Sequence, residues 1–124
     1  MTLRNIPGSK RARTYSPTIA GQTNCDALPT VVSPFVVTFV GEGVQVSGQI
    51  SVDPTAISLV TFRVSLPTGL KTPITNVGQI TGNCGNDVSN GEVIGNIANN
   101  TAEVRFLPTS AAIDTISVNF SYLN

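Results

Sequence analysis

Apolar and polar residues alternate through two neighbouring stretches in the middle of the chain, residues 44–52 and 60–66. In the first stretch Gly48 takes a place in the apolar series. A two-residue period puts apolar side chains on one face of a β-strand and polar side chains on the other. Asp53 and Pro54 separate the two runs, and both residue types favour turns. The pattern predicts an antiparallel hairpin with one dry face, which a second layer must cover.

Further apolar runs along the chain are separated by clusters of Gly, Pro, Asn and Ser, which are turn formers. The expected strands span residues 31–40, 44–52, 60–66, 74–82, 92–97, 101–107 and 116–122. Many short strands with frequent turn signals are typical of an all-β sandwich. We therefore expect an antiparallel β-sandwich of about seven to eight strands, formed by residues 31–124.

The first 30 residues show neither a helical nor a strand period, and Pro and Gly interrupt them repeatedly. A segment with so few apolar residues cannot order itself alone. We therefore expect residues 1–30 to be an extended N-terminal arm. Two interpretations fit: a disordered tail, or an arm that becomes ordered along a neighbouring subunit.

Charge is divided unevenly although the chain carries seven basic and seven acidic residues in total. The first 13 residues hold four basic residues and no acid, whereas all seven acids follow them. A basic arm ahead of an acidic body suggests that the arm binds a negatively charged surface. The residues expected to anchor it are Arg4, Lys10, Arg11, Arg13 and Tyr15.

The expected strand 31–40 is apolar on both faces, so one sandwich core can cover only one of them. Soluble monomers rarely expose sizeable apolar patches, and only 11% of the residues are charged to oppose association. The strand therefore predicts a subunit interface that involves Phe35, Val36 and Val40, through which the chain self-associates.

The residue inventory argues against catalysis. The chain contains no His, so neither a Ser-His-Asp triad nor a Cys-His pair can form. Two Cys cannot complete a four-thiolate metal site, and no glycine-rich stretch precedes a helix as a phosphate cradle would. We expect a protein that is not an enzyme and that needs no cofactor or metal. Cys25 and Cys84 could pair, although a cytosolic protein usually keeps thiols reduced.

No apolar run approaches the roughly 20 residues that span a bilayer, and the N-terminus lacks a signal-peptide core. We therefore expect folding in the cytosol and no membrane partner. The acidic body also argues against nucleic acid as the partner, despite the basic arm.

Three stretches of this sequence resemble a β-sandwich domain found in structural proteins of tailed bacteriophages. The residues that carry the resemblance are VQVSGQISVDPT (44–55), TFRVSLP (61–67) and VNFSY (118–122), and the similar region covers about two thirds of the chain. The resemblance implies a jelly-roll fold and membership of the capsid decoration (cement) proteins or the fibre and tail proteins. Such proteins are commonly trimers, so the resemblance implies that the chain self-associates as a homotrimer. Only an arm precedes the domain, with no coiled coil or long shaft, which favours a decoration protein.

The sequence thus leads to one principal functional hypothesis. The chain is expected to be a non-enzymatic virion structural protein on the capsid surface, where arm and sandwich bind and stabilise the major capsid protein shell. The alternative is a fibre or tail domain that binds a receptor or a carbohydrate through its loops.

Overall fold

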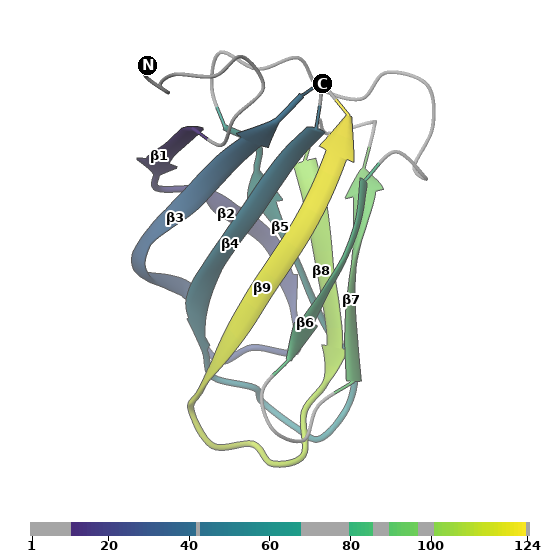
Figure 1. Ribbon diagram of the computed structural model, residues 1–124. Coiled ribbons are helices and arrows are strands. Elements are labelled where there is room, and N and C mark those ends of the chain that lie inside the picture. The colour runs from purple at the N-terminus through teal and green to yellow at the C-terminus, as the bar shows by residue number, and fades with distance from the viewer. Residues whose placement is uncertain (1–10, 42, 68–79, 86–89, 97–100, 124) are drawn as a thin grey trace, which may run out of the picture.

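The computed structural model describes residues 11–41, 43–67, 80–85, 90–96 and 101–123, which form nine β-strands (Figure 1). The strands are β1 (Arg11–Tyr15), β2 (Ile19–Thr23), β3 (Thr30–Val40), β4 (Gly43–Val52), β5 (Val60–Ser65), β6 (Ile80–Gly85), β7 (Asn90–Asn96), β8 (Thr101–Leu107) and β9 (Asp114–Leu123). All neighbours pair antiparallel, in the order β1-β3-β4-β9-β6-β7-β8-β5-β2. Within the part of the chain described, no helix is long and apolar enough to cross a membrane.

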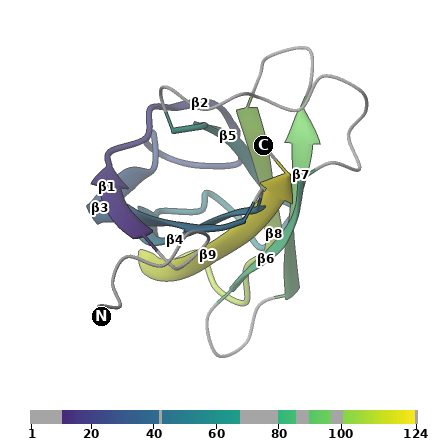
Figure 2. The ribbon, with the colours of Figure 1, turned by 45° about the horizontal axis from the view of Figure 1, so that its top comes forward.

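The strands fold over into two facing layers, so the all-β antiparallel sandwich predicted from the sequence is confirmed (Figure 2). We call β1, β3, β4 and β9 the first layer, and β7, β8, β5 and β2 the second layer. β6 lies where the strand order passes from one to the other, because it pairs with both β9 and β7.

The core lies between the two layers and consists of the inward-facing residues of alternating strands. Burial along β5 and β8 alternates without interruption, as the two-residue period of the sequence predicts. The largest fully buried side chains are Phe35, Phe62, Ile50 and Ile116. Burying such a side chain contributes about 1.5–3 kcal/mol, so this apolar interior is the main source of the fold's stability.

The last strand occupies the centre of the strand order rather than an edge. β9 pairs with β4 over ten residues, from Val52 opposite Asp114 to Gly43 opposite Leu123. On its other side it pairs with all six residues of β6. This second pairing extends β6 to Gly85, three residues beyond the strand predicted for residues 74–82, of which residues 74–79 lie outside the described part.

β3 is irregular near its start because of Pro34. Its pairing with β4 shifts register between Val31 and Ser33, and again between Ser33 and Val36. Pro has no N–H to donate to a ladder, so it is placed at bulges or edges. After the shifts, Phe35 and Val37 point into the core and Val36 points outward.

Residues 11–23 do not form the separate arm that the sequence predicts. β1 pairs with β3, from Arg11 opposite Phe39 to Tyr15 opposite Phe35, and β2 pairs with β5. Edge strands need little apolar pattern of their own, because the neighbouring strand supplies their hydrogen bonds. The sandwich therefore begins at or before residue 11 instead of near residue 31. Residues 1–10 lie outside the described part of the chain.

The short link between β1 and β2 crosses from one layer to the other and joins the two ends of the strand order. The Tyr15 hydroxyl donates to the Ser65 carbonyl oxygen over 2.9 Å. The Thr18 amide donates to Ser65 Oγ over 2.8 Å, and the Ser65 amide donates to the Thr18 carbonyl over 3.0 Å. These contacts fasten the open side of the folded sheet to the end of β5.

Candidate functional site

The outer face of the first layer carries hydroxyl and amide side chains and, among its described residues, no charged one. We call this surface the neutral face. Outward residues of β4 and β9 lie opposite one another, as in the pairs Gln45 with Ser121 and Ser47 with Asn119. The full set on these two strands is Gln45, Ser47, Gln49, Ser51, Thr115, Ser117, Asn119 and Ser121. On β3 the face continues with Val36, which is 41% exposed.

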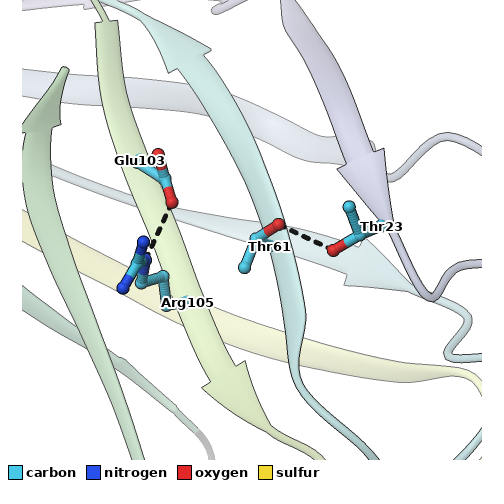
Figure 3. Close-up of polar contacts among 4 residues, drawn as sticks. All are labelled: Thr23, Thr61, Glu103 and Arg105. Carbon is cyan, nitrogen blue, oxygen red and sulfur yellow. Dashed lines mark hydrogen bonds and ion pairs between the residues drawn. The ribbon is translucent and has the colours of Figure 1, made fainter.

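The outer face of the second layer is instead charged, with both signs interspersed. Arg105 lies opposite Glu92 on β7, and Glu103 lies opposite Arg63 on β5. Figure 3 shows the Arg105 Nε atom donating to Glu103 Oε2 over 2.8 Å on β8. Beside them, the hydroxyls of Thr23 and Thr61 are 2.7 Å apart and tie β2 to β5 (Figure 3). We call this surface the charged face.

The ion pair on the charged face has a local electrostatic effect. Its hydrogen bond and the charge of Glu103 raise the pKa of Arg105, and Glu92 adds to this effect. Exposed pairs of this kind contribute about 0–1 kcal/mol, because water and salt screen them. The charged face is thus a hydrated surface whose charges compensate one another.

The predicted anchoring residues are engaged within their own chain where the structure describes them. Arg13 places its guanidinium 5.6 Å from the centroid of the Phe39 ring, a cation–π contact. Tyr15 packs edge-on against Phe35, with ring centroids 6.0 Å apart. β1 includes the backbone of Arg11, whereas Arg4 and Lys10 precede the described residues. Tyr15 is therefore a structural anchor of β1.

The structure places the residues of the predicted subunit interface in different environments. Phe35 is fully buried in the core of its own chain, so it is not available to another subunit. A strand that is apolar on both sides does not reveal which side faces the core, and here the Phe35 side does. Val36 is outward and partly exposed, while the side chain of Val40 lies outside the description.

Two tyrosines between the layers make the stability of the fold decrease at alkaline pH. Burial raises the pKa of Tyr122 to about 12, although Arg13 opposes the shift. Burial, with a smaller contribution from Tyr122, raises the pKa of Tyr15 well above its usual value. Unfolded tyrosines lose their protons near pH 10, so the unfolded chain binds fewer protons above this pH. The two tyrosines therefore contribute fully to the free energy of unfolding below pH 10, and this contribution is lost as the pH rises further.

We expect the urea midpoint to fall between pH 9 and pH 11, and the double substitution Tyr15→Phe with Tyr122→Phe to reduce this fall. At pH 7 the two single variants should differ. Tyr15→Phe loses the bond to Ser65 and about 1 kcal/mol, whereas the Tyr122 hydroxyl has no partner among the described residues. An equally steep pH dependence in the double variant would contradict this account.

Three loops meet at one end of the sandwich, residues 24–29, 53–59 and 108–113, and we call this surface the loop end. Asn24 organises the second loop, since its Nδ2 donates to the carbonyl oxygens of Ala56 and Ser58, each over 2.9 Å. Its Oδ1 accepts from the Ala56 amide over 3.1 Å. Asn24 has a positive φ of 61°, in the left-handed region that Asn tolerates.

Hydrogen bonds and a β-bridge hold the loops of the loop end together. The Asp26 amide donates to the Asp53 carbonyl over 2.9 Å, and Thr55 Oγ1 donates to Asp26 Oδ1 over 2.8 Å. Cys25 forms a β-bridge with Pro54 and is a buried, free thiol. The third loop contributes to a small hollow lined by Val52, Pro54, Phe106, Pro108, Thr109, Ser110 and Asp114.

Burial raises the pKa of the Cys25 thiol, and the carboxylates of Asp53 and Asp26 raise it further. A neutral thiol is a poor nucleophile and a poor metal ligand. Among the described residues there is no group of three or more Cys, Asp or Glu side chains that could hold a metal ion.

Comparison of the chain with protein-family models, with curated proteins and with solved structures finds no match. The surfaces of this molecule are therefore the basis for inferring its function. The loop end is not among the surfaces expected from the sequence. Its one signal was the position of Asn24 and Asp53 in turn-forming stretches, which gives no information on partners about 30 residues away.

Proposed function

We propose that the chain is a non-enzymatic structural protein of a virion, a capsid decoration protein that binds the major capsid protein on the outside of the shell. The observation that carries the proposal is the difference between the two outer faces of the sandwich. One face is neutral over its described residues and the other carries Arg63, Glu92, Glu103 and Arg105. The sequence resemblance to bacteriophage structural domains supports the choice of the major capsid protein as the partner.

The neutral face is the surface we assign to the shell. Protein–protein interfaces are depleted of charged residues at their cores, because a buried charge must be paired and hydrogen-bonded. The hydroxyls and amides of β4 and β9 can instead exchange hydrogen bonds with water for bonds with a partner. Val36 and Val32, 41% and 52% exposed, add apolar area on β3.

A carbohydrate-binding role is the alternative, because hydroxyl and amide side chains also bind sugar hydroxyls. Sugar-binding surfaces commonly add an aromatic ring as a platform. All seven aromatic residues of the chain are described, and each is buried or half-buried between the layers. This distribution favours a protein partner.

The test places a single charge on one face or the other and measures the occupancy of virus particles. Ser47→Glu and Asn119→Lys put opposite charges on exposed positions of the neutral face, and Ala20→Glu is the matched control at the exposed edge of the charged face. We expect both neutral-face variants to reduce copies per particle at least tenfold, and the control to leave the copy number unchanged. Quantitative mass spectrometry of purified particles, assembled in the presence of each variant, gives the copy number per particle.

Two results would contradict the proposal. One is the absence of the wild-type chain from purified particles. The other is equal occupancy by all three variants, with melting temperatures that show each to be folded, which would remove the neutral face from the contact.

A further inference from the structure

The loop end gathers most of the exposed apolar side chains of the described chain. Seven large apolar residues of the described part of the chain are exposed, and five of them lie at this end. They are Leu28, Ile57, Leu59, Leu107 and Ile113, with exposed fractions of 52%, 63%, 51%, 50% and 69%. Apolar groups collected on one surface mark a contact site more often than singly scattered ones.

The fold, and not the sequence order, brings these residues together. Asn24 and Asp26 fasten the first loop to the second through side-chain and backbone hydrogen bonds. Val60 lies opposite Phe106, which places Leu59 and Leu107 at adjacent strand ends. Val52 lies opposite Asp114, which brings Ile113 beside the same end. The apolar residues are therefore held on an ordered surface.

The same surface is acidic. Asp26, Asp53 and Asp114 lie in or next to the three loops, and residues 24–29, 53–59 and 108–114 contain no Lys or Arg. Two of these carboxylates act on one neighbour, since both Asp53 and Asp26 raise the pKa of the Cys25 thiol. A partner for this surface must thus carry apolar side chains together with positive charge.

One segment of this chain has that chemistry. Residues 1–10 contain Leu3 and Ile6 as apolar residues, Arg4 and Lys10 as basic residues, and no acid. The apolar residues match the exposed Leu and Ile side chains, and the basic residues match the three Asp. We call residues 1–10 the head.

The place where the head joins the sandwich decides which loop end it can reach. β1 begins at Arg11 opposite Phe39, beside the β3–β4 turn and at the far end from the three loops (Figure 1). Ten extended residues reach roughly 35 Å, and the eleven residues of β3 also span roughly 35 Å at about 3.3 Å each. Leu3 and Ile6 lie only eight and five residues before Arg11, so neither can reach the loop end of its own chain.

We propose that the loop end binds the head of a second copy of this chain, with Leu3 and Ile6 against the exposed apolar side chains and Arg4 and Lys10 against the aspartates. The contact is heterologous, because two different surfaces of the same chain meet. Repeated contacts of this kind close into a ring, such as a trimer, or extend as a filament. The inference concerns contacts between copies and does not depend on the shell contact proposed above.

Two full-length variants test the contact, each with one surface altered and the other intact. The head variant combines Arg4→Glu with Lys10→Glu. The loop variant combines Ile57→Ser with Ile113→Ser, at positions 63% and 69% exposed and therefore outside the core. In sedimentation experiments at micromolar concentration, without capsid, we expect the wild type to associate. Each variant alone should sediment as a single chain of 12.9 kDa.

An equimolar mixture of the two variants gives the decisive reading. The loop variant keeps an intact head, and the head variant keeps an intact loop end. The head of the first can therefore bind the loop end of the second, but the two altered surfaces that remain cannot bind a third chain. We expect a species of twice the single-chain mass, with no larger one, and a dissociation constant within a few-fold of the wild-type contact. Urea midpoints close to that of the wild type establish that both variants are folded.

Three outcomes would overturn the proposal: a monomeric wild type, a head variant that associates as the wild type does, or a mixture that remains monomeric. If Val36→Ser dissociates the wild-type assembly while the loop variant still assembles, the copies meet through β3 and the proposal is likewise wrong.

Discussion

Replacing Gly48 by Ala is expected to lower the free energy of unfolding by about 3 kcal/mol, at the upper end of the usual cost of overpacking a core. Gly48 occupies an inward position of β4, and the ring of Phe35 lies where its side chain would be. A Cβ added at Gly48 would overlap three atoms of that ring. The ring cannot retreat easily, because Phe35 is fully buried and Tyr15 packs edge-on against it.

A double-mutant cycle separates this overlap from other effects of the substitution. On a Phe35→Ala background the space above Gly48 is empty, and Ala is favoured over Gly in a strand because Gly loses more entropy on folding. The effect of Gly48→Ala should therefore change from strongly destabilising to neutral or stabilising. Urea denaturation of the four chains measures it, and an equal cost in both backgrounds would refute the explanation.

Replacing Asn24 by Ala is expected to cost about 3 kcal/mol, from lost hydrogen bonds at about 0.5–1 kcal/mol each and from a left-handed backbone that costs Ala about 1 kcal/mol more. The Asn24 side chain makes three hydrogen bonds to the loop 53–59, two to carbonyl oxygens and one from an amide. Its carbonyl oxygen also accepts from the Thr55 amide over 2.9 Å. The loop end should loosen in this variant before the core does.

Asn24→Gly is the matched control, since it removes the same side-chain bonds but adopts a positive φ without strain. It should cost about 1 kcal/mol less than Asn24→Ala. Thermal or urea unfolding of both variants gives the two values. If Ala and Gly cost the same, the backbone contributes nothing, and if neither costs stability, the hydrogen bonds do not hold the loop end.

The strands with strong alternation could be predicted from the sequence, whereas the strands that depend on a neighbour could not. β8 agrees residue by residue with the prediction for 101–107, because Ala102, Val104 and Phe106 face a dry interior and the residues between them face water. β1 has no such contrast. Its order comes from the edge of β3 and from the hydroxyl bond of Tyr15 to Ser65, 50 positions away.

Of the candidate surfaces, too, one could be predicted from the sequence and another could not. The neutral character of β4 and β9 is visible in the sequence as runs of Ser, Gln, Thr and Asn between apolar residues. The loop end cannot be recognised in the sequence, because Leu28, Ile57 and Ile113 are far apart in it. They come to the same end of the sandwich only through the pairing of β4 with β9 and the hydrogen bonds of Asn24. Phe35 shows a further limit, since an apolar residue on a two-sided apolar strand is read equally well as core or as interface.

The central position of β9 has a consequence for synthesis on the ribosome. A growing chain acquires β1 to β8 first, but β4 and β6 meet only through β9, which is made after the other eight described strands. Until residue 123 has emerged, the nascent chain exposes the long edges of β4 and β6 at the same time, and open edges of this kind promote aggregation. At about 5–20 residues per second, the interval between the end of β8 and the end of β9 lasts on the order of a second. A chain stalled in that interval is a substrate for chaperones rather than a partly working product.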